Sequence, residues 1–177
     1  YHNLECNIVS VGSAFDYSNL GCTHHCYGDF ALLKTLPNVD IFYPGSPLEF
    51  DELFKKSYDN GRVSYFRIPG SGHSFDFDKK DIVVSEPIKI CEGEDLTIVA
   101  TDPHLNTAEL IRNMFHAHGK TTEILYAHTI NPISDKTFLD SFKKTKRIVV
   151  IEEHMEKGGF GDDLLRKFFS IENLQFL

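Results

Sequence analysis

Two adjacent histidines, His24 and His25, lie between a predicted loop and a predicted helix. Imidazole has an ordinary pKa of about 6.5, so a histidine can give or accept protons at neutral pH. Because sequence neighbours cannot both point the same way, one interpretation puts one ring in a cleft and the other in packing. Two loop histidines bound to backbone fit the same spacing equally well, and the sequence leaves both interpretations open.

Arg67 lies near the carboxyl end of a predicted buried strand, in the run Tyr65-Phe-Arg-Ile-Pro69. A buried charge is unfavourable unless it is paired, so this guanidinium requires either an acidic neighbour or an anionic ligand. A phosphate or carboxylate group would satisfy it, and so would a salt bridge.

The segment from Cys22 to Cys26 contains two cysteines and two histidines, which are good zinc ligands. All four lie within five residues, which is too tight to surround a tetrahedral ion, and no second pair has suitable spacing elsewhere. We therefore predict no metal site. The cysteines are few and unevenly placed, which favours reduced thiols and a cytoplasmic protein over a disulfide framework; they are Cys6, Cys22, Cys26 and Cys91.

Residues 158–161, Gly-Gly-Phe-Gly, follow a predicted strand and open a predicted helix. Such a turn can bind an anion, but it lacks nucleotide-motif spacing, and Asp162 and Asp163 add negative charge at the helix start. Close packing or an interface turn is the favoured interpretation. Several scattered groups are expected at the surface or in supporting positions: Asp102, His104, His116, His118, His128 and Glu152-Glu-His154.

Apolar periodicity and turn residues predict strands alternating with helices in two successive series. The expected strands are residues 6–11, 39–43, 63–68, 96–100, 122–126 and 147–151, the first of them buried. The expected helices are residues 29–36, one starting after Ser46-Pro47, one from 106 or 107, one capped at 134–135, and one after 161; residues 171–177 would pair as a further strand. Alternation with short connections favours parallel pairing.

The predicted fold class is therefore α/β, with two domains of mainly parallel sheets flanked by helices. Residues 76–95 are rich in Gly, Asp, Lys and Glu and are predicted as the linker. The predicted domains are residues 1–75 and 96–177.

Size and charge exclude some classes of protein. The chain has 177 residues and a net charge of −8, which disfavours a nucleic-acid surface. No apolar run approaches the about 20 residues of a membrane span. The first residue is Tyr1 rather than Met, so we expect a fragment or a processed chain.

Two groups of motifs resemble the transketolase-like family of thiamine-diphosphate enzymes. The later half of the family's pyrimidine-binding domain resembles the set Gly21-Cys-Thr-His-His25, Asp29, Leu36-Pro-Asn38, Pro44 and Tyr65-Phe-Arg67. The family's C-terminal domain resembles the set Ile130-Asn-Pro132, Glu152-Glu-His154 and Gly158-Gly-Phe-Gly161.

This resemblance implies roles for three residues. His24 would be the catalytic group, facing the thiazolium and the substrate oxygens, while His25 and Arg67 would bind substrate, Arg67 at its distal anion. The sequence departs from the family at Cys22, where Pro is usual, and at Ser18-Asn-Leu20, which replaces an acidic stretch. These departures leave the identity of the substrate open.

The resemblance also implies thiamine diphosphate and Mg²⁺ as cofactors, mainly held by segments absent from this chain, so the chain alone is expected to be inactive. Cofactor-binding residues within it are unknown. The expected partners are a sugar-phosphate or 2-oxo-acid substrate, and a second copy or a subunit that binds the cofactor diphosphate.

The preferred activity is transfer of a two-carbon ketol unit between sugar phosphates. The alternatives are the β-subunit of a 2-oxo-acid dehydrogenase, which Thr129-Ile-Asn-Pro132 suits, and a non-catalytic assembly module.

Overall fold

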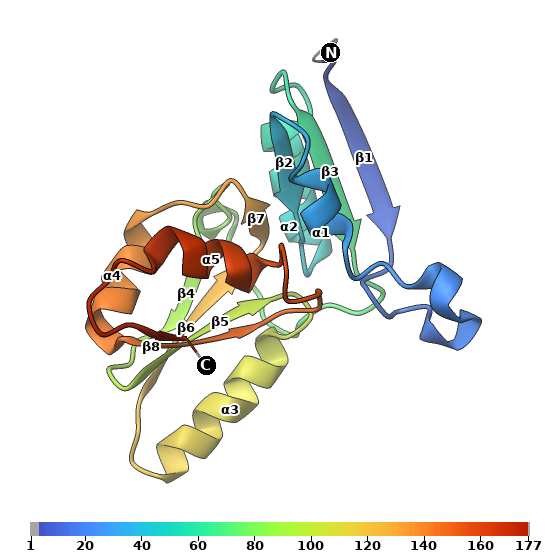
Figure 1. The fold of residues 1–177 in the computed structure, drawn as a ribbon. Coiled ribbons are helices and arrows are strands. Elements are labelled where there is room, and N and C mark those ends of the chain that lie inside the picture. The colour runs from blue at the N-terminus through green and yellow to red at the C-terminus, as the bar shows by residue number, and fades with distance from the viewer. Residues whose placement is uncertain (1–3, 177) are drawn as a thin grey trace.

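The structure is a computed structural model that describes residues 4–176 (Figure 1). Its strands are β1 (Cys6–Val11), β2 (Val39–Phe42), β3 (Val63–Ile68), β4 (Ile88–Cys91), β5 (Leu96–Thr101), β6 (Thr122–Ala127), β7 (Thr129–Asn131), β8 (Arg147–Ile151) and β9 (Gln175–Phe176). Its helices are α1 (Asp29–Leu33), α2 (Pro47–Ser57), α3 (Leu105–Ala117), α4 (Lys136–Thr145) and α5 (Phe160–Phe168). Three short 3₁₀ helices are η1 (Ser18–Leu20), η2 (Cys22–His24) and η3 (Lys79–Asp81).

The strands form two sheets, with the orders β1-β3-β2-β7 and β4-β6-β5-β8-β9. In the first sheet β1 and β2 both pair parallel to β3, and in the second β6 and β8 pair parallel to β5. Only β7 and β4 pair antiparallel to their neighbours within the described part of the chain. The predicted α/β class with mainly parallel sheets flanked by helices is confirmed.

Two apolar clusters hold the sheets together, and each cluster spans both of them. One cluster joins the α1 face of the first sheet, with Tyr65, to the α4 and α5 face of the second sheet, with Val99. The other joins the α2 face, with Phe66, to the α3 face, with Ile98. Because adjacent strand residues point to opposite faces, both faces of each parallel sheet are used, and burying them together fixes one sheet against the other.

Helix starts follow local sequence rules with one exception. The Ser46 hydroxyl accepts a hydrogen bond from Glu49 N at 3.2 Å, and Pro47 occupies the first helical position of α2, as predicted. Helix α1 is shorter than predicted, because it ends at Leu33, and its N-cap is Gly28 rather than Asp29.

Strand β1 is correctly placed, but the prediction that it is buried is wrong. It is an edge strand that pairs only with β3, and Val9 and Val11 are 49% and 67% exposed. Periodicity alone cannot separate a strand that is covered within its own chain from one whose apolar side chains stay open.

The predicted linker, residues 76–95, includes regular structure. It contains η3 and β4, and β4 belongs to the second sheet through its pairing with β6. In return β7, from the second half of the chain, pairs with β2 of the first sheet. The two sheets therefore interlock, and the domain limits at 75 and 96 stay a prediction.

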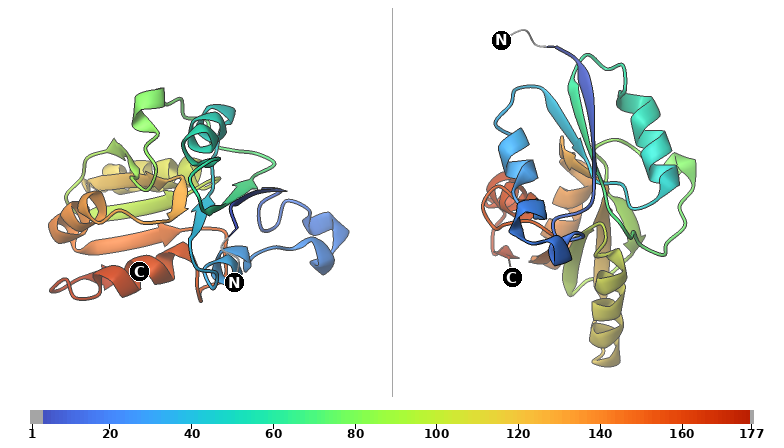
Figure 2. Two further views of the ribbon diagram at one scale, coloured as in Figure 1. Left: turned by 90° about the horizontal axis from the view of Figure 1, so that it is seen from above. Right: turned by 90° about the vertical axis from the view of Figure 1, so that its right-hand side faces the viewer.

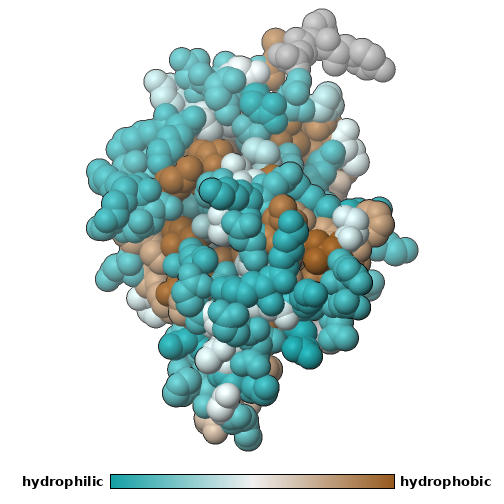
Figure 3. Space-filling view, turned by 90° about the vertical axis from the view of Figure 1, so that its left-hand side faces the viewer, coloured by the Kyte–Doolittle hydropathy of each residue, from teal (hydrophilic) through white to brown (hydrophobic). Residues whose placement is uncertain are grey.

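Figures 2 and 3 show the outline of the molecule. The segment between β1 and α1 extends away from the two sheets in the views of Figures 1 and 2. The face in Figure 3 is mainly hydrophilic, with small separate apolar areas. No helix within residues 4–176 is long and apolar enough to cross a membrane.

Candidate functional site

The segment between β1 and α1, residues 12–28, is called the histidine loop here because it carries His24 and His25. It begins at Gly12, which has a φ of 98°, and a Cβ at this position would lie 2.5 Å from the Tyr17 ring. Only glycine adopts this conformation without strain and also leaves room for the tyrosine. The short helices η1 and η2 then fold the loop into consecutive turns.

The two histidines have different surroundings. His24 is exposed at the end of η2, and its Nδ1 lies 3.0 Å from Thr23 Oγ1. His25 is half-buried, with its ring edge-on to Phe15 at a centroid distance of 5.2 Å, and its buried Nε2 has no hydrogen-bond partner among the described residues. The structure thus gives one histidine that can meet a ligand from solvent and one that packs.

Arg67 lies in the core below this loop. Its side chain is fully buried, and its Cζ lies 4.8 Å from the ring centroids of both Phe30 and Tyr43. Nη1 donates to the Glu153 backbone oxygen at 3.2 Å. The Asp29 carboxylate lies 3.7 Å from Nε, and the Glu153 carboxylate lies 3.9 Å from Nη2. Two carboxylates and two aromatic faces therefore balance the charge of Arg67.

No hydrogen bond, ion pair or ring contact within residues 4–176 joins Arg67 to His24 or His25. The guanidinium is nevertheless close to the loop, because its charge acts on the thiol of Cys26. Burial raises the pKa of this thiol, Asp29 raises it further, and Arg67 lowers it. Direct binding of a substrate anion by Arg67 stays a prediction, and its contacts in the structure are those of a supporting residue.

Glu153 is a site residue that the sequence analysis missed. It follows β8 in the second sheet and reaches the start of the histidine loop. Its Oε2 accepts hydrogen bonds from Ser13 Oγ and from Ala14 N, the latter at 3.1 Å, and Tyr43 Oη lies 3.5 Å away. The available signal was its place at the carboxyl end of a parallel strand, where α/β proteins gather functional groups.

The neighbouring residues of the Glu152-Glu-His154 run also connect the two sheets. The His154 ring stacks on Phe30 at 5.2 Å with an interplanar angle of 5°, and its Nε2 accepts from Ala31 N at 3.4 Å. Met155 N donates to Tyr27 O at 2.9 Å. The turn after β8 therefore contacts both the end of the histidine loop and helix α1.

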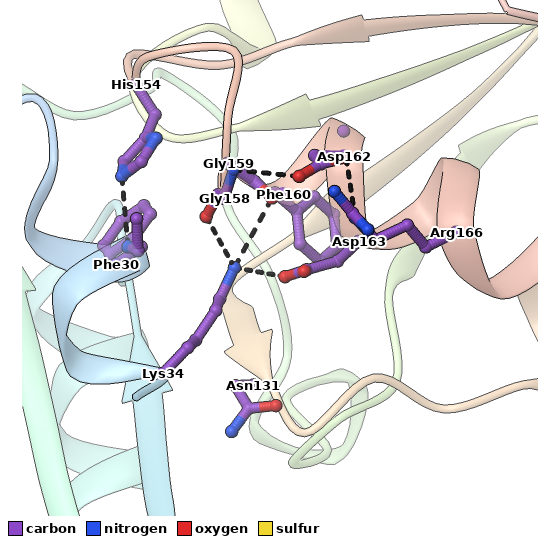
Figure 4. A network of polar contacts seen from close by, with 12 residues as sticks. Phe30, Lys34, Asn131, His154, Gly158, Gly159, Phe160, Asp162, Asp163 and Arg166 are labelled. Atoms are coloured by element: carbon purple, nitrogen blue, oxygen red, sulfur yellow. Dashed lines mark hydrogen bonds and ion pairs between the residues drawn. The ribbon is translucent and has the colours of Figure 1, made fainter. Parts of the chain in front are cut away.

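The Gly-Gly-Phe-Gly turn serves close packing, as predicted. Glu152 accepts from Phe160 N at 2.7 Å and from Gly161 N at 2.8 Å, so a carboxylate already occupies the start of α5. A Cβ on Gly159 would lie 2.6 Å from Glu152 Oε1. Figure 4 shows the adjoining contact, in which Lys34 Nζ reaches from the end of α1 to the oxygens of Gly158, at 3.1 Å, and Gly159.

A second polar group is buried between the sheets around Glu49. Its carboxylate accepts from Tyr126 Oη at 2.7 Å and from Gly45 N at 2.9 Å, and it lies 2.7 Å from His73 Nε2. Burial raises the pKa of this carboxyl, but hydrogen bonds from His73 and the other donors outweigh burial, so the net pKa is lowered. Glu49 is therefore a buried anion stabilised by convergent donors.

Asp102 lies beside this group and behaves in the opposite way. Its Oδ1 accepts from His73 N at 3.1 Å, while its buried Oδ2 has no hydrogen-bond partner among the described residues. Burial raises its pKa to about 7, an effect that nearby Glu49 strengthens and His73 opposes. The pair Glu49 and Asp102 thus combines an ionised and a near-neutral carboxyl in one interior.

The largest apolar hollow is separate from the predicted site residues. It has a volume of ≈ 510 Å³ at the carboxyl ends of the first sheet, and its lining includes Val9, Gly45 and Pro69. The predicted residues His24, His25 and Arg67 do not line it. Within residues 4–176 no group of three or more His, Cys, Asp or Glu side chains is arranged to bind a metal ion.

Comparison with known families identifies the second half of the chain. Residues 87–174 match the family described as "Transketolase, C-terminal domain". A 1-deoxy-D-xylulose-5-phosphate synthase from Halothermothrix orenii is 27% identical over 148 residues, which are 82% of this chain and 23% of the synthase. One of the two subunits of an apulose-4-phosphate transketolase from Phocaeicola vulgatus is 27% identical over 163 residues, which are 91% of this chain and 52% of that protein.

Solved structures share the fold. A chain described as "Split gene transketolase, inactive beta4 tetramer" superposes with a TM-score of 0.84 at 23% identity, covering 97% of this chain and 55% of that one. A transketolase from Campylobacter jejuni gives a TM-score of 0.70 at 14% identity, covering 95% of this chain and 30% of that one. The chain spans about half the length of the apulose-4-phosphate transketolase subunit, and about a quarter of the synthase.

Proposed function

Because the chain belongs to the transketolase-like family, with residues 87–174 as its transketolase C-terminal domain, we propose that it forms part of a thiamine-diphosphate-dependent enzyme. The proposed reaction is transfer of a two-carbon ketol unit between sugar phosphates. The chain contributes a wall of the active site, and other segments or chains bind the cofactor.

The observation that carries this proposal is the exposed imidazole of His24 on a loop held at both ends. Ala14 N, near the start of the loop, donates to Glu153, and Tyr27 O, near its end, accepts from Met155 N. A side chain on such a support is positioned without being buried, which general acid–base catalysis requires. His24 is proposed to exchange a proton with a substrate oxygen, and the packed ring of His25 to border the substrate.

The chain fits only part of the cofactor. The described residues offer no acidic cluster for a metal ion, so no step through Mg²⁺ or the diphosphate is derived for this chain. Thiamine diphosphate, when bound by other segments, supplies the carbanion chemistry. The contribution of this chain is to orient substrate oxygens and to move a proton at His24.

The names of the relatives favour phosphorylated sugars as substrates. The synthase and the apulose-4-phosphate transketolase are both named for phosphorylated sugars, which supports the sugar-phosphate interpretation over the β-subunit of a 2-oxo-acid dehydrogenase. A synthase reaction that forms a deoxy-sugar phosphate is the second candidate, because both relatives have the same 27% identity to this chain.

The test uses the chain assembled with the cofactor-binding segments, either as a full-length protein or with a separate subunit. We expect turnover with xylulose 5-phosphate and ribose 5-phosphate in the presence of thiamine diphosphate and Mg²⁺. Turnover only with pyruvate and glyceraldehyde 3-phosphate would select the synthase, and turnover only with 2-oxo acids and an oxidant would select the dehydrogenase. No turnover with any pair would support the assembly module.

A further inference from the structure

We propose that Glu153 is a positioning residue for the histidine loop, so that the C-terminal domain holds His24 and His25 in their working arrangement. The inference rests on the proposed function, because it assigns a role to those histidines. It adds a physical reason why a transketolase-like enzyme would couple its C-terminal domain to this loop.

The direct contacts of Glu153 are with the first residues of the loop. Its Oε2 accepts from Ser13 Oγ and from Ala14 N, and both of these residues are almost completely buried. A carboxylate that accepts two donors fixes them more strongly than a neutral acceptor would. The backbone at 13–14 is therefore attached to the end of β8 and not only to its own strand.

A second hydrogen bond carries this restraint to the histidines. Ala14 O accepts from Cys26 N at 3.0 Å, and Cys26 directly follows His25. Ala14 therefore connects the Glu153 carboxylate to the residue beside the histidine pair. Phe15 extends the connection, because its ring contacts His25 at 5.2 Å and stacks on Tyr27 at 5.7 Å.

The carboxylate itself is held in place from below. Arg67 Nη1 donates to the Glu153 backbone oxygen at 3.2 Å, and Nη2 lies 3.9 Å from Oε2. The buried guanidinium thus fixes the backbone and balances the charge of the residue that holds the loop. This arrangement gives Arg67 an indirect part in positioning the histidines.

The preceding residue makes a different set of contacts. Glu152 accepts from Phe160 N and Gly161 N at the start of α5 and contacts its own domain only. Glu153 contacts the loop instead. The two adjacent carboxylates therefore divide into one that stabilises a helix and one that acts across the two sheets.

The first test reads the loop without any cofactor, by amide hydrogen exchange on the 177-residue chain. In Glu153→Gln, exchange at Ala14 and Cys26 is expected to rise about tenfold, the scale of one charge-assisted hydrogen bond, with no change in β5 and β6. Glu153→Ala is expected to raise it further, because glutamine retains an acceptor oxygen. Glu156→Gln, an equal charge change in the same exposed turn, is the matched control.

Two results would overturn the proposal: unchanged exchange at Ala14 and Cys26 in both Glu153 variants, or an equal rise in Glu156→Gln. If neither Glu153 variant folds, Ser13→Ala removes one donor and is expected to raise exchange at Cys26; no rise there counts against the proposal.

The second test is a double-mutant cycle in the assembled enzyme. Glu153→Gln is expected to lower kcat about tenfold in the wild-type background and to have no further effect when His24 is already alanine, because it acts through that histidine. Additive losses would overturn the positioning role. An enzyme without turnover would contradict the proposed function while leaving the exchange result to decide the role of Glu153.

Discussion

Glu49 Oε1 and His73 Nε2 lie 2.7 Å apart, and neither side chain is exposed. The orientation of the pair is fixed, because His73 Nδ1 accepts from Phe75 N at 3.2 Å and Nε2 must therefore carry the hydrogen. A neutral imidazole thus donates to a buried carboxylate. Since Tyr126 of the second sheet donates to the same carboxylate, this pair connects the two sheets.

The first prediction concerns the stability that this carboxylate provides. Glu49→Gln replaces one acceptor oxygen by an amide that also donates, so at least one buried donor loses its partner. We expect a loss of about 2–4 kcal/mol in the free energy of unfolding, measured by urea denaturation at pH 7. Asp51→Asn on the exposed side of the same helix is the control and should change little; an equal loss in both variants would contradict the assignment.

The second prediction concerns Asp102, whose pKa is raised to about 7 by burial and by Glu49, against the opposing effect of His73. Between about pH 4 and pH 7 the unfolded chain loses this proton while the folded chain keeps it, so the Asp102 contribution to stability falls as pH rises. Asp102→Asn removes the titration. Its stability relative to wild type should therefore increase from pH 4 to pH 8, by on the order of 3 kcal/mol, in unfolding curves taken across that range.

The third prediction has the opposite sign. Burial lowers the pKa of His128 to about 4. Between about pH 4 and pH 6.5 the unfolded chain binds a proton at His128 that the folded chain does not, so the His128 contribution to stability rises with pH. His128→Asn should lose less stability than wild type when pH is lowered from 6.5 to 4.5. The exposed His116, changed to Asn, serves as the control, and matching acid profiles for His128→Asn and wild type would refute the prediction.

The fourth prediction concerns the contact between α1 and the glycine turn. Lys34→Met keeps the length of the side chain but removes the donor to Gly158 O and Gly159 O and the ion pair with Asp163. We expect a loss of about 1–3 kcal/mol and faster amide exchange in α1. Lys157→Met, an exposed change in the same turn, should leave both unchanged.

The sequence was sufficient for the strands and helices because their signals are local. The Ser46-Pro47 start of α2 and the apolar run of β5 depend on residues within a few positions. The exposure of β1 and the interlocking of β4 with β6 and of β7 with β2 are not local, since they depend on which segments meet in space. No spacing rule could have revealed them.

The same distinction applies to the candidate site. His24 and Arg67 were found because a histidine pair and a strand-end arginine stand out by residue type. The position of Arg67 in the core and the contact of Glu153 with Ser13 depend on the fold, and the latter joins residues 140 positions apart. Glu153 has nothing in its own sequence surroundings to separate it from Glu152, so only the fold distinguishes the residue that contacts the loop from the one that caps α5.

The fifth prediction separates the two histidines by kinetics in the assembled enzyme. His24 is exposed and His25 packs on Phe15. His24→Ala should therefore lower kcat about 10²- to 10⁴-fold, the range for loss of a general acid or base, with a small change in KM. His25→Ala should mainly raise KM, because it loosens the wall of the pocket. His116→Ala on α3 is the control for removing an imidazole far from the loop. Equal kcat values for His24→Ala and His116→Ala would show that the loop histidine takes no part in proton transfer, and the assembly interpretation would then be favoured.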